Sequence, residues 1–466
     1  MSTPVGILAF IFILGSAVIL HEFGHFIVAK MFRIRVEAFS FGLGPRLFGI
    51  RFGDTDYRVS AIPLGGYVKL GGDESNAPLE GEGAVDVPVH ERFDLRPRWQ
   101  KFLVAIAGPV MNILTALAIP LAGAMLYGIP ATPAPVVSRV VRGGAAEQAG
   151  LVTGDRIVAF NGTENPKWSL IHGDALLSPG QPLPLIVERN GQRVPMTIKP
   201  TPRTEEGETA GTLDFTPDYG NVPIVISDVG PGTPASEAGL QIGDHIVAIN
   251  GQAVGSAEQV SQAIQDHKAE PIVLKLERKG QVFEVTTKVR RLSDGRERLG
   301  IAQEEEIPLR KASLFAASRY AVQQNVEIVR LTGKALGQFF SGKRSARNTL
   351  SGPIGIYSAV RSSVIRFGWD GLFSILGFLS LNLGVFNLLP IPVLDGGAIF
   401  LLLIEGLLAL VGMTISATVR ERIQQVGFVV VVLLMVFVIT NDVLKRVSSP
   451  APESPPAATT VPEPGK

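Results

Sequence analysis

The sequence predicts an α-helical polytopic membrane protein with about four transmembrane helices and a duplicated mixed α/β domain between the second and third. Three observations support this fold class. Of the 466 residues, 46% are hydrophobic and the mean hydropathy is +0.28, which is too apolar for an ordinary soluble protein. Several stretches of about 20 residues carry no charge, as spans require. A fourteen-residue motif occurs twice, 89 residues apart.

Composition limits the chemistry that the chain can perform. The net charge is +1, which gives no reason to expect a nucleic-acid partner. The chain has no cysteine, so disulfides and thiolate metal sites are excluded and histidines and carboxylates are the strong ligands available.

Residues 1–30 are expected to form the first span. No basic residue precedes the apolar run and no small-residue cleavage pattern follows it, so we expect a retained helix over about residues 4–29. The span ends in His21-Glu22-Phe23-Gly24-His25. Positions four apart return to one helix face about 6 Å along the axis, so His21 and His25 could present two imidazoles to one metal ion, with Glu22 beside them.

This H-E-x-x-H arrangement offers two zinc ligands and a carboxylate that can act as a base. Ionisable groups are costly at the end of an apolar span, so each should face protein and have a partner. The alternative is a helix end whose polar groups only reach toward the interface.

Residues 31–101 are expected on the cytoplasmic side, because basic residues flank the spans at both ends. Within them, residues 57–70 alternate β-prone runs with Pro63 and Gly65-Gly66, which indicates a hairpin. The functional interpretation is a strand edge, including Tyr67, that pairs with an unwound substrate; the alternative is a plain loop hairpin.

Residues 102–128 form the predicted second span, which is uncharged and contains Gly108-Pro109 and Asn112. Asn112 would lie roughly 15 Å into the bilayer. Helix packing through small residues with one interhelical hydrogen bond is a sufficient explanation for it.

The repeated motif, A-G-L-x-x-G-D-x-I-x-x-x-N-G, lies in two segments that we assign to residues 129–220 and 221–305. The pattern resembles bacterial PDZ domains, so the resemblance implies two tandem PDZ domains that bind extended peptides by adding a strand to a sheet edge. They could also be spacers that exclude bulky proteins. Gly211 and Gly300 are 89 residues apart as well, and the resemblance places the binding loops near Gly211 and near residues 299–301.

The remaining segments complete the topology. Residues 306–370 are predicted to form amphipathic linker helices at the membrane surface or along the repeats, with a turn at residues 351–356. Residues 371–412 hold the third span and a short helix, residues 423–446 a fourth span, and residues 447–466 a disordered Pro-rich tail.

The third span runs into Asn387-Leu388-Leu389-Pro390-Ile391-Pro392-Val393-Leu394-Asp395. Irregular backbone at membrane depth is tolerated only where protein or a watery cavity surrounds it, so Asp395 is a functional candidate. His21 lies about 24 Å, and Asp395 at most about 36 Å, from the outer side, so both are expected near the inner boundary.

Together, H-E-F-G-H, G-P-V-M-N, the two repeats and N-L-L-P-I-P-V-L-D-G resemble the site-2 protease family of intramembrane zinc metalloproteases, in its regulator-of-sigma-E branch. The resemblance implies that His21, His25 and Asp395 bind Zn²⁺ and that Glu22 is the general base. It implies that Asn387 and the β region around Gly65, Gly66 and Tyr67 hold substrate, while Asn112, Pro390 and Pro392 support the core.

The function expected from this resemblance is cleavage of single-pass membrane proteins, such as an anti-sigma factor or leftover signal peptides. The protein would lie in a bacterial inner membrane, with the PDZ domains on the periplasmic or outer side and the active site near the cytoplasmic side. Two alternatives are a PDZ adaptor without catalysis and a metal transporter. The adaptor leaves the buried ionisable residues unexplained, and a transporter needs polar groups along a continuous path.

Overall fold

The computed structural model describes residues 3–73, 87–205, 208–220, 222–255, 257–266, 271–291, 297–343 and 352–448. The chain divides into two compact units, each described by itself. The first contains residues 1–126, 203–210 and 313–466, and the second contains residues 127–202 and 211–312. Apart from residues 447 and 448, the predicted disordered tail lies outside the described residues.

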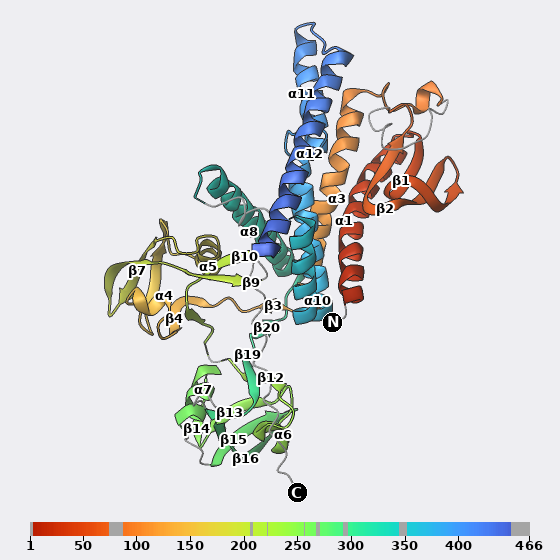
Figure 1. The fold of residues 1–466 in the computed structure, drawn as a ribbon. Coiled ribbons are helices and arrows are strands. Elements are labelled where there is room, and N and C mark those ends of the chain that lie inside the picture. The colour runs from red at the N-terminus through yellow and green to blue at the C-terminus, as the bar shows by residue number, and fades with distance from the viewer. Residues whose placement is uncertain are drawn as a thin grey trace. The chain divides into compact units, whose positions relative to one another are not determined.

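Four helices of the first unit are long and apolar enough to cross a membrane, counted over the described residues. They are α1 (Thr3–Met31), α3 (Arg98–Leu126), α10 (Pro353–Asn387) and α12 (Ala417–Ser448), drawn in Figure 1. Small side chains of α1, including Ala9 and Ala17, pack against Leu372 of α10. Their outer surfaces expose large apolar side chains, which is the pattern expected where a helix faces lipid.

Helix α10 contains a sharp bend at Gly368, whose φ of 58° lies in the left-handed region. Val360, before the bend, packs with Leu372 and Leu376 after it, so the first part of α10 folds back on the span. The turn predicted at residues 351–356 is therefore wrong, because α10 already begins at Pro353. The carboxylate of Asp442, in α12, accepts hydrogen bonds from the backbone N–H groups that open this helix.

Helix α8 (Leu314–Phe340) packs against α3 through small and polar residues. Pro120 of α3 has no N–H, so the carbonyl of Ala116 loses its helical donor. Asn325 Nδ2 of α8 replaces it, donating to Ala116 O at 3.0 Å. A side chain from one helix thus satisfies a carbonyl that a proline frees in another.

The predicted β region is larger than a single hairpin. Strand β1 (Val36–Phe52) pairs with β2 (Thr55–Leu70) along its whole length, and residues 38–41 pair with both halves of β2 at once. The pairing therefore builds a four-segment sheet in the order 46–52, 55–60, 36–43 and 65–70. Residues 65–70 form one edge and pair only with residues 36–43 among the described strands.

Short helices complete the first unit. The 3₁₀ helix η1 (Val89–Glu91) follows the β sheet, and α11 (Asp395–Leu410) lies between α10 and α12. Helix α11 packs against α3.

The second unit consists mainly of two six-stranded sheets with one topology. The first has the order β11-β4-β5-β7-β8 with β6 beside β5, and the second has the order β16-β15-β13-β12-β19 with β14 beside β13. Each encloses its own apolar core. We call them repeat 1 and repeat 2.

The bounds of repeat 1 are β4 (Ala134–Val140), α4 (Ala145–Gln148), β5 (Arg156–Phe160), β6 (Thr163–Glu164), α5 (Trp168–Leu176), β7 (Leu183–Arg189), β8 (Gln192–Ile198) and β11 (Phe215–Asp218). Those of repeat 2 are β12 (Ile224–Val229), α6 (Pro234–Glu237), β13 (His245–Ile249), β14 (Gln252–Ala253), α7 (Ala257–Asp266), β15 (Pro271–Arg278), β16 (Gln281–Lys288) and β19 (Ile301–Glu305). Two small pairs accompany them: β3 (Ile129–Pro130) with β20 (Leu309–Arg310), and β17 (Arg290–Arg291) with β18 (Glu297–Arg298). A further pair, β9 (Thr201–Glu205) with β10 (Glu208–Thr212), includes residues 203–210, which belong to the first unit.

The aspartate of the repeated motif has the same structural role in both repeats. Asp155 accepts from Arg189 Nε at 2.7 Å and from the Val152 N–H, and Asp244 is bonded in the same way by Arg278 and Gln241. Burial raises the pKa of each carboxyl, but the arginine and the backbone N–H outweigh it and hold the pKa below its ordinary value. The motif therefore encodes an Asp–Arg ion pair that joins β5 to β7 in repeat 1 and β13 to β15 in repeat 2. We call the pairs Asp155–Arg189 and Asp244–Arg278 the clamps.

The 89-residue spacing does not extend to the ends of the repeats. Val141 N donates to Asp214 O, and the equivalent Gly230 N donates to Gly300 O. Asp214 and Gly300 both have a positive φ and both precede the edge strand, yet they are 86 residues apart. The prediction that Gly211 corresponds to Gly300 is therefore wrong, since the connection before β11 is three residues longer.

Candidate metal centre

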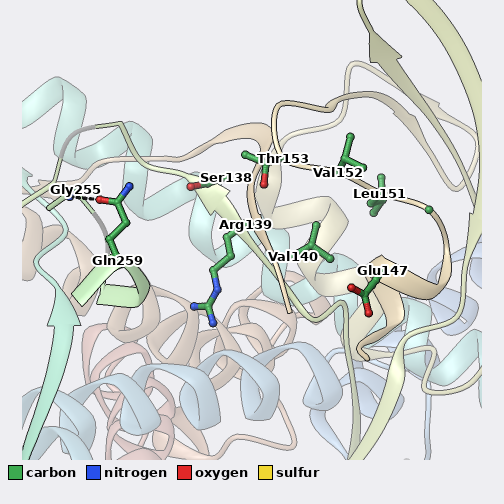
Figure 2. Close-up of a pocket in the computed structure, with 10 residues that line it drawn as sticks. Ser138, Arg139, Val140, Glu147, Leu151, Val152, Thr153, Gly255 and Gln259 are labelled. Atoms are coloured by element: carbon green, nitrogen blue, oxygen red, sulfur yellow. Dashed lines mark hydrogen bonds between the residues drawn. The ribbon is translucent and has the colours of Figure 1, made fainter. Parts of the chain in front are cut away.

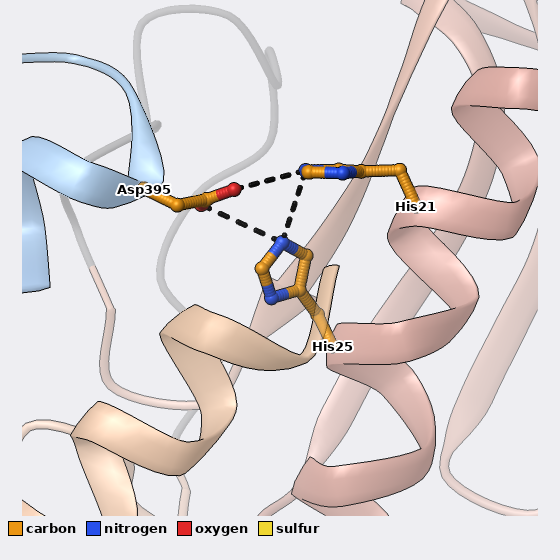
Figure 3. Close-up of side chains that lie close together, drawn as sticks. All are labelled: His21, His25 and Asp395. Carbon is orange, nitrogen blue, oxygen red and sulfur yellow. Dashed lines mark hydrogen bonds and ion pairs between the residues drawn. The ribbon is translucent and has the colours of Figure 1, made fainter. Parts of the chain in front are cut away.

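Helix α1 and the start of α11 bring three ligand-type side chains together (Figure 3). The Nε2 atoms of His21 and His25 are 3.3 Å apart. Asp395 Oδ2 lies 2.9 Å from His21 Nε2, and Oδ1 lies 3.5 Å from His25 Nε2. One ligand atom from each of the three residues lies within 4.8 Å of the others, so all three can reach one ion.

The crossing of α1 and α3 depends on two glycines. A Cβ on Gly24, inside the H-E-x-x-H segment, would overlap with the carbonyl of Ala107, and a Cβ on Gly108 would overlap with the His25 ring. Glycine at both positions lets the helices approach closely. The approach also brings His25 Nδ1 within 2.7 Å of the Val104 carbonyl, which fixes the ring by accepting the Nδ1 proton.

The loop of residues 388–394 carries the chain from α10 to Asp395. Its backbone folds back on α11, where a Cβ on Gly396 or Gly397 would overlap with the carbonyl of Leu389 or Ile391. Val393 has a φ of 84°, which is rare for a β-branched residue. Pro392 packs on Gly427 of α12, and Pro390 lies in the same loop. The carboxylate is therefore held by an irregular segment that α12 supports.

Two amides contact His21 from opposite sides. Asn112 Nδ2 lies 3.2 Å from His21 Nδ1, and Asn387 Nδ2 lies 3.3 Å from His21 Nε2. A neutral imidazole has only one acceptor nitrogen, so both NH₂ groups cannot donate to it. Asn112 Oδ1 is buried without a partner. A half-turn of this amide lets Oδ1 accept the Nδ1 proton and leaves the lone pair at Nε2.

The donor set fits a zinc ion. Two Nε2 atoms and one carboxylate converge, while the two Nδ1 atoms are turned to the Val104 carbonyl and to Asn112. Although Asp395 Oδ2 lies close to His21, it is buried and accepts no hydrogen bond of good geometry. Two histidines and one carboxylate form a common ligand set of catalytic zinc sites and leave a position for water.

Glu22 lies between this centre and the β sheet. A Cβ built on Gly66 would lie 2.9 Å from Ser40 O and 3.3 Å from Glu22 Cγ, and the backbone of Val68 also faces the Glu22 carboxylate. Gly65, with a φ of 106°, precedes them. Tyr67 points to the other face of the strand, where it is buried and its hydroxyl accepts a hydrogen bond from Arg58.

The structure thus brings Asn387 and Gly66 close to the three ligands and Glu22, and places the Tyr67 side chain elsewhere. It also gives roles to residues that the sequence analysis did not single out or assigned only to packing. Gly24, Gly108 and the Val104 carbonyl define the helix crossing, and Asn112 faces a ligand. The sequence signals for them are a glycine inside the polar motif, and a glycine and an asparagine within the uncharged second span.

A separate cavity of about 670 Å³ lies in the second unit (Figure 2). Its lining includes Arg139, Glu147 and Gln259, whose Oε1 accepts from the Gly255 N–H. Glu147 is the one carboxylate among the described lining residues, and it accepts a hydrogen bond from Gly143 N. Among the described residues that line the cavity, no second acid and no histidine could work with it.

Residues 9–434 match Peptidase family M50. The chain belongs to this family, the site-2 protease family. It is 31% identical over 461 residues to "Regulator of sigma-E protease RseP" of Salmonella typhimurium, with 93% of this chain and 97% of the relative covered. It is 30% identical to the protein of that name from Escherichia coli, with coverages of 93% and 97%. A Vibrio cholerae protein named "Putative zinc metalloprotease" is 33% identical, with the same coverages.

The membership in the site-2 protease family that the motifs predict is therefore confirmed, and the chain is a metalloprotease by family. Two solved structures, PDZ domains of SdrC-like proteins from Listeria monocytogenes and Listeria innocua, are 20% and 22% identical. They cover 17% and 18% of this chain and 85% and 96% of their own, with TM-scores of 0.16 and 0.17. Scores this low add nothing to the description of the repeats.

Proposed function

We propose that this M50 protein is an intramembrane zinc endopeptidase that cleaves single-pass transmembrane substrates. The observation that carries the proposal is the convergence of His21 and His25, from the first span, with Asp395, more than 350 residues later. Three ionisable side chains at membrane depth are costly unless they serve one site.

His21, His25 and Asp395 would hold the zinc ion, which when bound acts as a Lewis acid that polarises the scissile carbonyl and makes water a stronger acid. Glu22 takes the proton of the attacking water and passes it to the leaving amine. The Asn387 amide lies 3.3 Å from His21 Nε2, so it would donate to the substrate carbonyl as negative charge develops on oxygen.

The substrate strand would pair with residues 65–70. This edge is unpaired within the described sheet, and Gly66 places it against Glu22. A helical substrate has its carbonyls in hydrogen bonds, so it must unwind before attack, and pairing with a strand edge replaces the bonds that are lost.

The biological setting follows from the relatives. Because several are named regulators of sigma-E, we infer that the substrate is an anti-sigma factor in envelope stress signalling, with signal-peptide remnants as a further class. Two tandem PDZ domains would stand on the outer side of the inner membrane and the metal centre near the cytoplasmic side.

Three measurements on purified protein, zinc content, peptide cleavage and zinc movement into vesicles, separate this function from a PDZ adaptor and a metal transporter. The protease predicts about one zinc ion per chain and cleavage of a transmembrane peptide in detergent. An adaptor gives neither. A transporter moves zinc across a vesicle membrane but leaves the peptide intact, and either of these two results would contradict the proposal.

A further inference from the structure

The end of α1 contains an arginine in a backbone conformation that is usual for glycine. Ile34 N donates to Ala29 O, and this bond closes the last turn of the helix. Arg33 N donates to Lys30 O, which completes the pattern of a Schellman motif. The motif needs a left-handed residue at position 33, and Arg33 supplies it with a φ of 57°, where glycine would carry no strain. Because the Arg33 side chain is exposed, packing does not explain the strain, and a function of its charge does.

Arg33 lies where the end of α1 meets the start of α3. Arg96 Nη2 donates to the carbonyl of Arg33 at 2.9 Å. The ring of Trp99 packs edge-on against Phe32, with ring centroids 5.2 Å apart. The two helices whose crossing positions His25 are therefore joined at this end as well.

Three basic side chains near this joint have no acidic partner. Lys30, Arg33 and Arg98 are exposed and form no ion pair within the described part of the chain. The carboxylates of the neighbouring segment face other arginines, in the pairs Glu91–Arg35 and Asp94–Arg92. The joint therefore presents positive charge that the protein itself does not neutralise.

Apolar side chains lie directly beside these cations. Met31 follows Lys30 and Trp99 follows Arg98, and these two apolar side chains are 72% and 56% exposed. Helix α3 carries no charge from residue 102 to its end, so the joint stands where that span leaves the hydrocarbon. Tryptophan and basic residues are typical of this boundary. We call the following residues the joint surface: Lys30, Met31, Arg33, Arg98 and Trp99.

We propose that the joint surface binds the headgroup of an anionic phospholipid. Its cations complement the lipid phosphate, while Met31 and Trp99 contact the glycerol and the upper part of the acyl chains. A zwitterionic lipid carries its own cation beside the phosphate, so the surface should prefer a lipid with net negative charge. Binding of this lipid requires neither zinc nor cleavage, so the inference is independent of the protease proposal.

A bound headgroup would connect the two helices that carry the joint surface. Arg33 belongs to the end of α1 and Arg98 to the start of α3, and without an anion between them their charges repel. The lipid phosphate replaces this repulsion by attraction to both. Anionic lipid should therefore stabilise the crossing of α1 and α3, and with it the whole first unit.

The test uses the full-length chain in nanodiscs made from equal amounts of phosphatidylcholine and phosphatidylglycerol. The protein is released with the lipids that it retains, and native mass spectrometry counts each kind. We expect the wild type to retain phosphatidylglycerol at least about tenfold better, because each cation near an anionic lipid contributes roughly a fivefold preference. Its unfolding temperature should also be higher in these nanodiscs than in pure phosphatidylcholine.

A pair of double variants tests whether the joint surface is the site. Lys30→Gln with Arg98→Gln should lower the retention of phosphatidylglycerol by about tenfold or more. Arg51→Gln with Arg422→Gln is the matched control, because it removes the same charge from exposed positions on β1 and α12. The control should retain phosphatidylglycerol as the wild type does.

Arg33→Gly should change lipid binding and stability in different directions. It removes a cation, so the retention of phosphatidylglycerol should fall about fivefold. It also relieves the left-handed strain, so the unfolding temperature in pure phosphatidylcholine should stay the same or rise. An arginine that only closes the helix would instead leave lipid retention unchanged, and that result, or a lower unfolding temperature, would contradict the proposal.

Equal retention of the two lipids by the wild type, or an equal loss in the control variant, would overturn the proposal. Displacement of phosphatidylglycerol by millimolar inorganic phosphate would also overturn it, because the site would then bind a free anion and not a lipid. If the Lys30 and Arg98 double variant unfolds in pure phosphatidylcholine, Arg98→Gln alone replaces it and should lower retention about fivefold.

Discussion

At the residue scale, the candidate centre depends on glycines, which leave space between the helices, as much as on the side chains that could bind a metal ion. His25 can turn Nε2 toward Asp395 only because Gly108 leaves room for its ring. A methyl group there must displace either the imidazole or the helix, since the overlap involves a ring held at Nδ1 by Val104 O.

Gly108→Ala is therefore expected to remove most zinc from the purified protein. Gly123→Ala is the matched control on the same helix, because nothing lies within 4 Å of its Cβ position, and it should retain the wild-type zinc content. Metal analysis of the two variants measures this, and equal zinc in both would show that the crossing tolerates a side chain.

Asn112 is expected to act as a positioning residue for His21. Asn112→Ala should weaken zinc affinity by about 10- to 100-fold, the usual effect of removing a partner of a ligating histidine. Asn112→Asp, which keeps an acceptor for the Nδ1 proton, should retain more affinity than the alanine variant. Competition with a fluorescent chelator measures both. A role in packing alone predicts that neither variant changes zinc affinity.

How far the site could be predicted depends on how local each signal is. His21, Glu22 and Asp395 were recognisable because ionisable groups in apolar sequence are expensive and therefore stand out. The sequence of Asn112 and its neighbours predicts only a packing role, and no spacing rule reveals its contact with His21, 91 positions away. Gly24 and Gly108 matter only through the helix crossing.

At the scale of elements, α8 is tied to α3 at a carbonyl that a proline frees. Asn325→Leu should destabilise the protein by about 1–3 kcal/mol, because the Ala116 carbonyl is then buried without a donor. In a Pro120→Ala background the helical N–H is restored, so the same substitution should cost much less. A double-mutant cycle of unfolding in detergent measures the difference, and additive effects would contradict the assignment.

The clamps of the second unit predict a pH dependence. The pKa values of Asp155 and Asp244 are lowered in the folded chain, whereas the pKa of an aspartate in an unfolded chain is about 3.9. Their stabilisation is therefore complete above that pH and is lost as the pH falls through the folded pKa.

Acid unfolding followed by Trp168 fluorescence, with Trp99 and Trp369 replaced by Phe, should be flat from about pH 7 to 5 and steepen below about 4. Arg189→Met should lower stability at neutral pH and reduce that steepening. An unchanged acid profile in this variant would show that the Asp155 clamp does not contribute.

The elements also show where sequence patterns mislead. In α8 the larger apolar side chains, such as Phe315 and Val326, are exposed, whereas Ala317, Ala321 and Asn325 form the buried face. The contact of α8 with α3 uses small and polar residues and leaves the large ones outside it, so the apolar pattern indicates the wrong face. Likewise, Gly211 and Gly300 have the 89-residue spacing of the motif, but repeat 1 contains three additional residues before β11. Asp214, and not Gly211, is therefore the residue equivalent to Gly300.

At the scale of the whole molecule, the apolar helices described for the first unit converge on one polar site. The spans of α1, α3 and α10 contribute His21, Asn112 and Asn387 to it, and α12 supports the loop before Asp395 through Gly427. The ligands come from opposite ends of the sequence, so the site exists only when the complete bundle is assembled. We therefore expect truncation before α12 to lower zinc content as well as activity.

The central claim is that the three ligands hold zinc while Glu22 moves the proton. The most direct measurement compares wild-type protein with Glu22→Gln for zinc content and for cleavage of a transmembrane peptide in detergent. We predict about one zinc ion per chain in both and a rate at least about 10²-fold lower in the variant. Cleavage by Glu22→Gln at the wild-type rate, or wild-type activity without zinc, would contradict the account.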